Sequence, residues 1–298
     1  MARADYEEQL RRHAGQWDVL PFGLPVPSLA WASDSSGRCG GTLDLTEAVL
    51  EGNRWPAVSG ALLAECACRC ATLAMLMRSA DPAIRQIAVR FRRAIRVAEP
   101  RTRPHVADGV SEVRWTAAVD DASPATTVGI ELSRQLPGAA APVVAVQARA
   151  QFDAADATAA TVQADRRIAD YLATLPQRLA LPAYELGWSD TEIRGVCREM
   201  PGSLLGAAEE ALGDAGKIAR GLGVPDDHDE SMLLAEMTYR WVRPVQDGRA
   251  TYVARTGERR RDEKGRTWLG VTADLDLDGE RVGEAEGSVV FQTVPRRS

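Results

Sequence analysis

One order of elements occurs twice along this 298-residue chain, and it limits the fold more than any other feature. Each copy opens with an apolar stretch of helical composition, 59–77 in the first copy and 200–223 in the second. A series of alternating segments typical of antiparallel strands follows each one, and Phe152 near the end of the first series matches Phe291 in the second. The period is far too long for a solenoid, so the repeat predicts a duplicated fold.

The predicted fold class is α+β, with each half an antiparallel sheet wrapped around one long apolar helix. We expect an N-terminal domain over 1–155, an Ala-rich helical connector over 156–182 and a C-terminal domain over 183–298. The DLDG segment at 276–279 predicts a tight hairpin turn. The expected strands are 28–32, 41–45, 84–97, 109–121, 126–136, 142–153, 231–245, 249–261, 266–279 and 281–294.

Composition excludes several classes of protein. The chain is 45% apolar and 26% charged, which is typical of a globular protein. No stretch approaches the roughly 20 apolar residues of a membrane-spanning helix, and the charged N-terminus has no apolar run, so we expect neither a membrane partner nor a secretory signal. The net charge of −6 argues against general nucleic-acid binding. Five cysteines, an odd number, favour a reducing cytoplasm over a disulfide framework.

Two clusters of metal-ligand residue types are weak candidates. Cys66, Cys68 and Cys70 recur with a period of two, which points the thiols in different directions on a helix, so buried structural cysteines are expected. The PDDHDE run at 225–230 lacks ligand spacing and is typical of a solvated loop. The sequence therefore predicts no metal and no cofactor.

The segment 56–65, PAVSGALLAE, carries a resemblance to a known family. It resembles the second half of the motif that leads into the central helix of the β-hydroxyacyl-ACP dehydratases of fatty-acid synthesis, which have the hot-dog fold. In this resemblance Gly60 takes the place of the family's glycine and Glu65 that of its helix acid. Two such units in one chain also resemble the dehydratase domains of modular polyketide synthases and the double-hot-dog thioesterases and hydratases.

The sequence departs from the family at the catalytic histidine. The resemblance would put that residue near Glu51, where the chain has no histidine. The second copy retains Gly202 but has Ala207 in place of the acid. The three histidines of the chain, none of them at a motif position, are His13, His105 and His228.

The chemistry implied by the resemblance needs an acid, a base and donors to the thioester oxygen. The backbone N–H groups of Gly60 and Gly202, each at the expected start of a helix, are candidate donors. Glu65, in an apolar helix, is the leading candidate for the acid or base. Glu51 is the candidate to replace the histidine, although a loop glutamate is usually just exposed.

Three interpretations of Glu65 remain open at this point. It is an active-site carboxylate, or a buried acid paired with an arginine such as one from the strand at 90–96, or a partly solvated side chain. Glu209 is a weaker catalytic candidate, because it adjoins Glu210 and helix geometry turns one of the two to solvent.

Arginines gather around 90–103 and 255–266. They form either a solvated sheet face or a docking site for an acidic acyl carrier protein or the phosphates of CoA. The residues predicted to contact substrate or carrier are Trp55, Arg92, Arg96, Tyr239 and Arg243.

The leading hypothesis is a dehydratase-like hot-dog enzyme of polyketide or fatty-acid-type metabolism that acts on an acyl thioester bound to acyl carrier protein or CoA. Without the histidine, we expect carboxylate-based dehydration, isomerisation or cyclisation. The alternatives are a hot-dog acyl thioesterase and a non-catalytic, acyl-binding pseudo-dehydratase. The sequence leaves open whether the protein is a homodimer.

Overall fold

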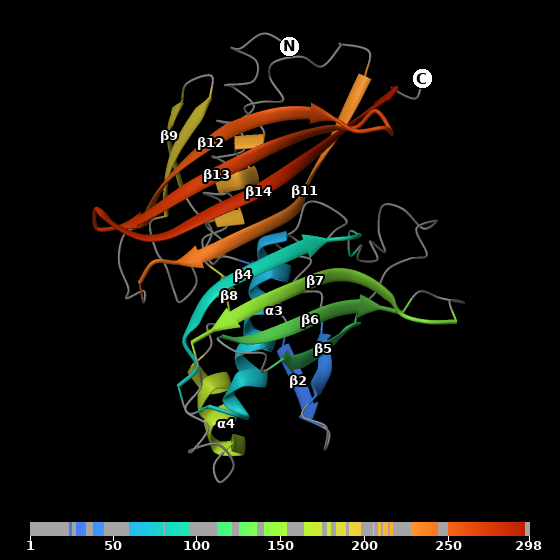
Figure 1. The fold of residues 1–298 in the computed structure, drawn as a ribbon, viewed down its shortest axis with the longest axis vertical. Helices are drawn as coiled ribbons and strands as arrows, with labels where there is room; N and C mark the ends of the chain where they lie inside the picture. Colours follow the sequence, from blue (N-terminus) through green and yellow to red (C-terminus); the bar gives the residue numbers. More distant parts are fainter. Residues whose placement is uncertain are drawn as a thin grey trace. The chain divides into compact units, whose positions relative to one another are not determined.

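The computed structural model divides the chain into two compact units (Figure 1). The first unit spans residues 24–179, and the second contains the described residues from 183 onwards. The domain boundaries predicted at 155 and 182 stay a prediction. The structure describes residues 24–25, 28–33, 38–44, 60–79, 81–93, 95, 112–120, 125–135, 140–153, 164–174, 178–179, 183–188, 191–197, 205, 208–209, 211–213, 215–216, 228–243 and 250–295.

The first unit contains a six-stranded sheet with the order β2-β3-β5-β6-β7-β4, and its neighbouring strands are antiparallel. A short strand pair, β1 with β8, joins the two ends of the unit. Its elements are β1 (Leu24–Pro25), β2 (Ser28–Ser33), β3 (Cys39–Asp44), α3 (Gly60–Leu76), β4 (Ile84–Phe91), β5 (Glu112–Asp120), β6 (Thr126–Arg134), β7 (Val143–Phe152), α4 (Ala164–Thr174) and β8 (Arg178–Leu179).

The second unit repeats this strand order as β9-β10-β12-β13-β14-β11. Its strands are β9 (Ala183–Trp188), β10 (Glu192–Cys197), β11 (His228–Trp241), β12 (Ala250–Arg261), β13 (Thr267–Leu277) and β14 (Glu280–Pro295). Phe152 pairs with Thr126, the first residue of β6, and Phe291 pairs with Thr267, the first residue of β13. The topology and this shared register confirm the duplication.

Turn chemistry confirms the predicted hairpin between β13 and β14. The last pair of the ladder joins Leu277 to Glu280, which leaves a two-residue loop of Asp278 and Gly279. Both loop residues have positive φ, 50° and 85° respectively, as a type I′ turn requires.

The strands β9 and β10 are absent from the sequence predictions. Gly195 lies in the middle of β10, and a glycine within a strand weakens the apolar alternation that marks strands in a sequence. The structure compensates from a neighbouring strand, because Tyr252 of β12 is the register partner of Gly195 and its ring occupies the space where a Cβ would lie.

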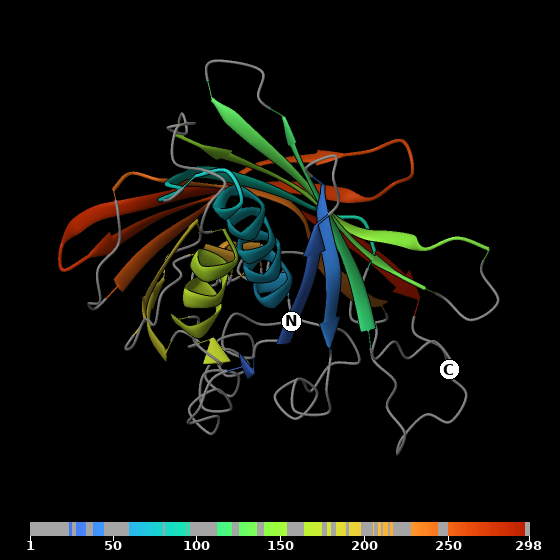
Figure 2. The ribbon, with the colours of Figure 1, turned by 90° about the horizontal axis from the view of Figure 1, so that it is seen from below.

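Helix α3 is the core element of the first unit. It is rich in Ala, Leu, Met and Cys, nearly all of its residues are buried, and it contacts β4, β5, β6 and β7. Figure 2 shows α3 beside α4 on one side of the sheet. The large side chains that β5 and β6 turn toward the core include Trp115 and Ile130. Among the described residues, no helix is long and apolar enough to cross a membrane.

In the second unit, the described part of the expected helix is helical at 205, 208–209, 211–213 and 215–216. Its buried side chains include Leu205, Ala208 and Leu212.

The C-terminal end of α3 is capped from α4. The last turn of α3 contains no basic residue, but Arg167 of α4 donates from Nε and Nη2 to the carbonyl oxygen of Leu76 at 3.3 and 3.1 Å. A cation at this position satisfies a free helix carbonyl and complements the negative end of the helix dipole.

We expect Arg167→Met to lower the free energy of unfolding by about 1–2 kcal/mol, because the charge-assisted bonds to Leu76 are lost. Urea denaturation measures the change. The matched control is Arg166→Met, since that exposed guanidinium lies 3.9 Å from Asp170, and we expect little change. Equal losses in the two variants would contradict the capping role.

Candidate active site

Glu65 forms a buried ion pair with Arg69, one turn further along α3. Arg69 Nε donates to Glu65 Oε1 at 2.8 Å, and each residue is 5% exposed. The second carboxylate oxygen, Oε2, is buried and has no hydrogen-bond partner among the described residues. The alternative of a buried acid paired with arginine therefore describes the geometry, but the arginine comes from the same helix. The sequence predictions did not include this pair, although the i,i+4 spacing of Glu65 and Arg69 is the signal that would have indicated it.

The ion pair belongs to a polar stripe of α3 that is covered by α4. Cys68 and Thr72 follow Glu65 at helical spacing and lie on the same stripe. A side-chain hydrogen bond joins Thr72 to Tyr171 of α4. Burial raises the pKa of the Tyr171 hydroxyl, the nearby Cys68 and Glu65 act in the same direction, and the bond to Thr72 opposes them. The buried carboxylate thus lies on the stripe of α3 that faces Tyr171 of α4.

Two of the three cysteines of α3, Cys66 and Cys70, are buried core residues, and Cys68 is half-buried. Burial raises the pKa of the Cys66 thiol to about 12 and that of Cys70 well above its usual value. Both thiols are therefore neutral at pH 7. Within the described ranges, no group of three or more His, Cys, Asp or Glu side chains is placed to hold a metal ion.

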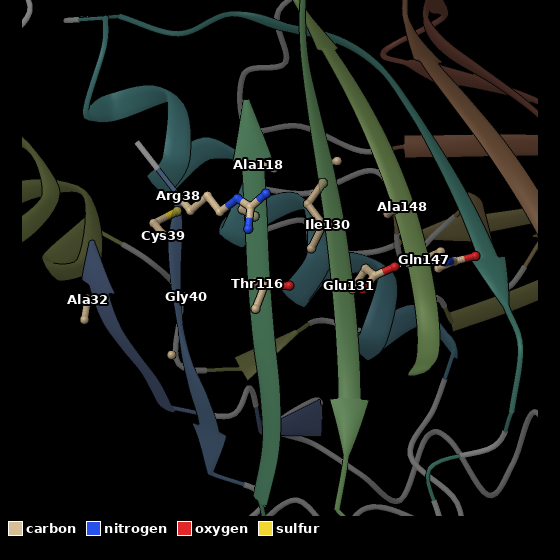
Figure 3. Close-up of a pocket in the computed structure, with 13 residues that line it drawn as sticks. Ala32, Arg38, Cys39, Gly40, Thr116, Ala118, Ile130, Glu131, Gln147 and Ala148 are labelled. Atoms are coloured by element: carbon tan, nitrogen blue, oxygen red, sulfur yellow. Dashed lines mark hydrogen bonds between the residues drawn. The ribbon is translucent and has the colours of Figure 1, made fainter. Parts of the chain in front are cut away.

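A hollow of about 870 Å³ lies on the other face of the first-unit sheet, away from α3 (Figure 3). Small residues such as Gly40, Ala118 and Gly129 create it. At its edge, Arg92 Nε donates to Gln147 Oε1 and Gln147 Nε2 donates to Glu131 Oε1, both at 3.0 Å. This hollow does not contain Glu65.

Comparisons with solved structures identify the fold. No protein-family model matches the chain, and no curated protein matches its sequence. A putative thioesterase II from Thermobifida fusca YX superposes with a TM-score of 0.53 at 13% identity, over 91% of this chain and 99% of that one. A conserved protein with a hot dog fold from Alicyclobacillus acidocaldarius superposes with a TM-score of 0.50 at 13% identity, over 90% and 97%.

The chain has the hot-dog fold. The dehydratase domain from the CurJ module of curacin polyketide synthase is also similar, with a TM-score of 0.52 at 10% identity, over 91% of this chain and 98% of that one. The large antiparallel sheet expected from the sequence is therefore confirmed. The identities are low, so these likenesses concern the fold alone.

The structure places five of the nine predicted site residues of this hot-dog protein. Besides Glu65, Gly60 is the first residue of α3, where its N–H has no partner within the helix. Tyr239 is fully buried on β11, with its ring 4.5 Å from that of Trp241. Arg92 is bound to Gln147, and Arg243 forms an ion pair with Glu280. Four predicted site residues lie outside the described residues: Glu51, Trp55, Arg96 and Gly202.

Arginines of the second hot-dog unit are engaged with acids of the same unit. Arg255 binds Glu192 at 3.1 Å and Asp274 at 2.7 Å, and Arg281 binds the other oxygen of Asp274 at 2.5 Å. The two arginines are exposed and the two carboxylates are half-buried, so water screens these pairs and their net contribution to stability is small. The geometry favours the interpretation of this part of the 255–266 cluster as a solvated face.

Asp262 organises the hairpin between β12 and β13. It accepts hydrogen bonds from the indole Nε1 of Trp268 at 3.0 Å and from the backbone and side chain of Arg266 at 2.9 and 2.7 Å. These bonds, that of Trp268 most of all, hold the pKa of Asp262 below its usual value. The guanidinium carbons of Arg260 and Arg266 lie 5.7 and 5.5 Å from the centre of the Trp268 ring.

We expect the bond between Trp268 and Asp262 to persist at about pH 4 and to weaken only as the pH falls further, toward the lowered pKa of Asp262. A carboxylate whose pKa is lower in the folded state stabilises the hairpin fully above the unfolded pKa of about 3.9, and this contribution is lost as the pH falls through the folded value. The indole N–H resonance of Trp268 in an NMR titration reports the change. Asp262→Asn should abolish that pH dependence, and an identical titration in the variant would contradict the assignment.

Proposed function

We propose that this protein acts on an acyl thioester of acyl carrier protein or CoA, with Glu65 as its acid–base group. The observation that carries the proposal is the Glu65 carboxylate, in which Arg69 holds one oxygen while the other is buried without a partner among the described residues. An unsatisfied buried oxygen costs about 1–3 kcal/mol, and a substrate that shares a proton with it would offset this cost. The names of similar structures, which include a thioesterase II and a polyketide synthase dehydratase domain, support the substrate class.

The proposed chemistry uses two parts of α3, the free N–H groups of its first turn and the side chain of Glu65. The first N–H groups of the helix, including that of Gly60, would donate to the thioester oxygen as enolate charge develops. Glu65 Oε2 would take the α-proton, and Arg69 would keep the carboxylate in position through Oε1. In a dehydration, the electron pair of the broken C–H bond forms the C=C bond, and the β-hydroxyl leaves with a proton as water. Isomerisation and cyclisation would start from the same proton transfer.

Several sequence predictions stay part of this proposal. We extend the helix-on-sheet arrangement of the first unit to the second, with Gly202 as its backbone donor. Glu51 remains the candidate second acid–base group, and Trp55 and Arg96 remain candidate substrate contacts. For Arg92, Tyr239 and Arg243 we retain a role in substrate or carrier binding, which requires the two arginines to exchange their present partners. A cytoplasmic location and a homodimer also remain proposals.

The test uses the purified full-length chain and a panel of β-hydroxyacyl and saturated thioesters of CoA and acyl carrier protein. Mass spectrometry detects loss of water or rearrangement of the acyl group. We expect Glu65→Gln to lower kcat/KM at least about 100-fold, because the amide cannot take a proton. Glu131→Gln, an exposed carboxylate on the opposite sheet face, should leave the activity unchanged. Full activity in Glu65→Gln, or no turnover of any substrate, would overturn the proposal.

Hydrolysis is the second candidate reaction, and the thioesterase among the similar structures favours it. Release of a free thiol, followed with a thiol reagent in the same assays, separates hydrolysis from dehydration or cyclisation. Binding without turnover is the third candidate, and the buried ion pair of Glu65 with Arg69 favours it. Measurable binding of a thioester without formation of any product would establish this third candidate.

A further inference from the structure

Arg134 is a buried arginine on the inner face of the first-unit sheet. It is the last residue of β6 and is 8% exposed. The burial pattern of β6 places it on the same face as Ile130 and Leu132, the face that packs toward α3. Continuing the register of β5 and β6 by one residue brings Arg134 alongside Val113, which pairs with Leu43 of β3. Its surroundings on the sheet are therefore aliphatic.

The guanidinium of Arg134 has unsatisfied donors. Both Nε and Nη1 are buried, and neither has a hydrogen-bond partner among the described residues. A guanidinium remains charged at every accessible pH, so the chain cannot relieve this cost by losing a proton. Buried charges in proteins are paired or bind a ligand.

A second buried arginine provides the internal comparison. Arg69 is 5% exposed, close to the 8% of Arg134, and it binds the carboxylate of Glu65 at 2.8 Å. Arg69 is thus neutralised by a carboxylate of its own helix, whereas Arg134 of the same unit has no partner for Nε and Nη1 among the described residues. An oxygen anion supplied by a ligand would complete the second site as Glu65 completes the first.

We propose that Arg134 binds an oxyanion of the ligand. Because its register neighbours on β5 and β7 are Val113 and Val143, the ligand portion that reaches Arg134 is largely apolar and carries one anionic group. Given the proposed function, on which this identity rests, that group is a carboxylate at the far end of the acyl chain. A phosphate of CoA offers the same chemistry, and the experiment separates the two sources.

The first arm compares glutaryl-CoA with hexanoyl-CoA by calorimetric titration of the full chain. If the acyl carboxylate is the anion, Arg134→Met lowers the affinity for glutaryl-CoA about 10-fold or more and leaves that for hexanoyl-CoA unchanged. If a CoA phosphate is the anion, the variant loses the same factor for both. Unchanged affinity for both overturns the proposal. Arg149→Met, an exposed arginine of β7, is the matched control.

The second arm needs neither CoA nor turnover. Glutarate and inorganic phosphate are expected to raise the Tm of the wild-type chain and not that of Arg134→Met. Without anions, Arg134→Met should raise the Tm by about 2–4 °C, because an apolar side chain of similar length replaces a buried charge whose Nε and Nη1 have no partner among the described residues. A lower Tm in the variant together with no anion response in the wild type would show that the guanidinium is paired within the chain. Since both arms measure binding or stability, their outcome is separate from that of Glu65→Gln.

Discussion

Adding one methyl group at Gly283 is expected to lower the free energy of unfolding by about 3 kcal/mol, the upper end of the range for overpacking. A Cβ built on Gly283 lies 2.9 Å from Cε2 of Tyr239 and overlaps its Cζ and Oη. The ring has no room to withdraw, because Tyr239 is fully buried and stands edge-on to Trp241 at 4.5 Å. Gly283→Ala therefore has to displace a rigid core side chain or the strand β14 itself.

Urea denaturation of Gly283→Ala and of a matched glycine variant checks this prediction. Gly129→Ala is the control, because the nearest atom to its added Cβ is 3.9 Å away, an ordinary contact distance. We expect this control to stay within about 0.5 kcal/mol of the wild type. In Tyr239→Leu, which shortens the side chain, Gly283→Ala should cost less than in the wild type, since neighbouring substitutions couple. Equal effects of the two alanines in the wild-type background would refute the packing argument.

The second large effect is expected at the buried ion pair. Arg69→Met leaves the carboxylate of Glu65 buried with no hydrogen-bond partner among the described residues, which should cost about 3–5 kcal/mol of unfolding free energy. The double variant Glu65→Gln with Arg69→Met removes the stranded charge, so we expect it to be more stable than Arg69→Met alone. The free energies come from urea denaturation at pH 7.

An exposed ion pair of similar geometry serves as the control. Arg85 Nε lies 2.6 Å from Asp153 Oδ1, but the two side chains are 55% and 45% exposed. Water solvates the remaining charge when one partner is removed, so Arg85→Met should be far less damaging than Arg69→Met. If the two arginine variants lost equal stability, burial would not be the cause, and the argument that burial makes the Glu65 carboxylate costly would fail as well.

Much of the fold was predictable because the signals are local. The apolar composition of 59–77 predicts a helix, and α3 runs from Gly60 to Leu76. The alternation in 126–136 predicts a strand, and β6 runs from Thr126 to Arg134. One of the strands that the sequence predictions missed, β10, shows the limit, because Gly195 fits there only with Tyr252 packed over it from another strand.

The candidate site was predictable only in part. A glutamate in an apolar helix marks Glu65 as unusual in the sequence, and Arg69 at i+4 was available as a partner. The residues around Glu65 in the sequence do not indicate that Tyr171, about a hundred residues further along, packs against the polar stripe of α3. The strand pattern likewise does not show that Nε and Nη1 of Arg134 are buried with no hydrogen-bond partner in the described part of the chain.

Element order, the duplication and the turn at Asp278 and Gly279 were determined by the sequence itself, because periodicity and backbone preference act over a few residues. Which polar groups are paired was decided only in the tertiary structure. Arg69 and Arg134 are both charged and both buried, and they differ in what the folded chain brings within about 3 Å of each guanidinium. Hydrogen bonds act over that short range, so the pairing depends on strand register and helix packing.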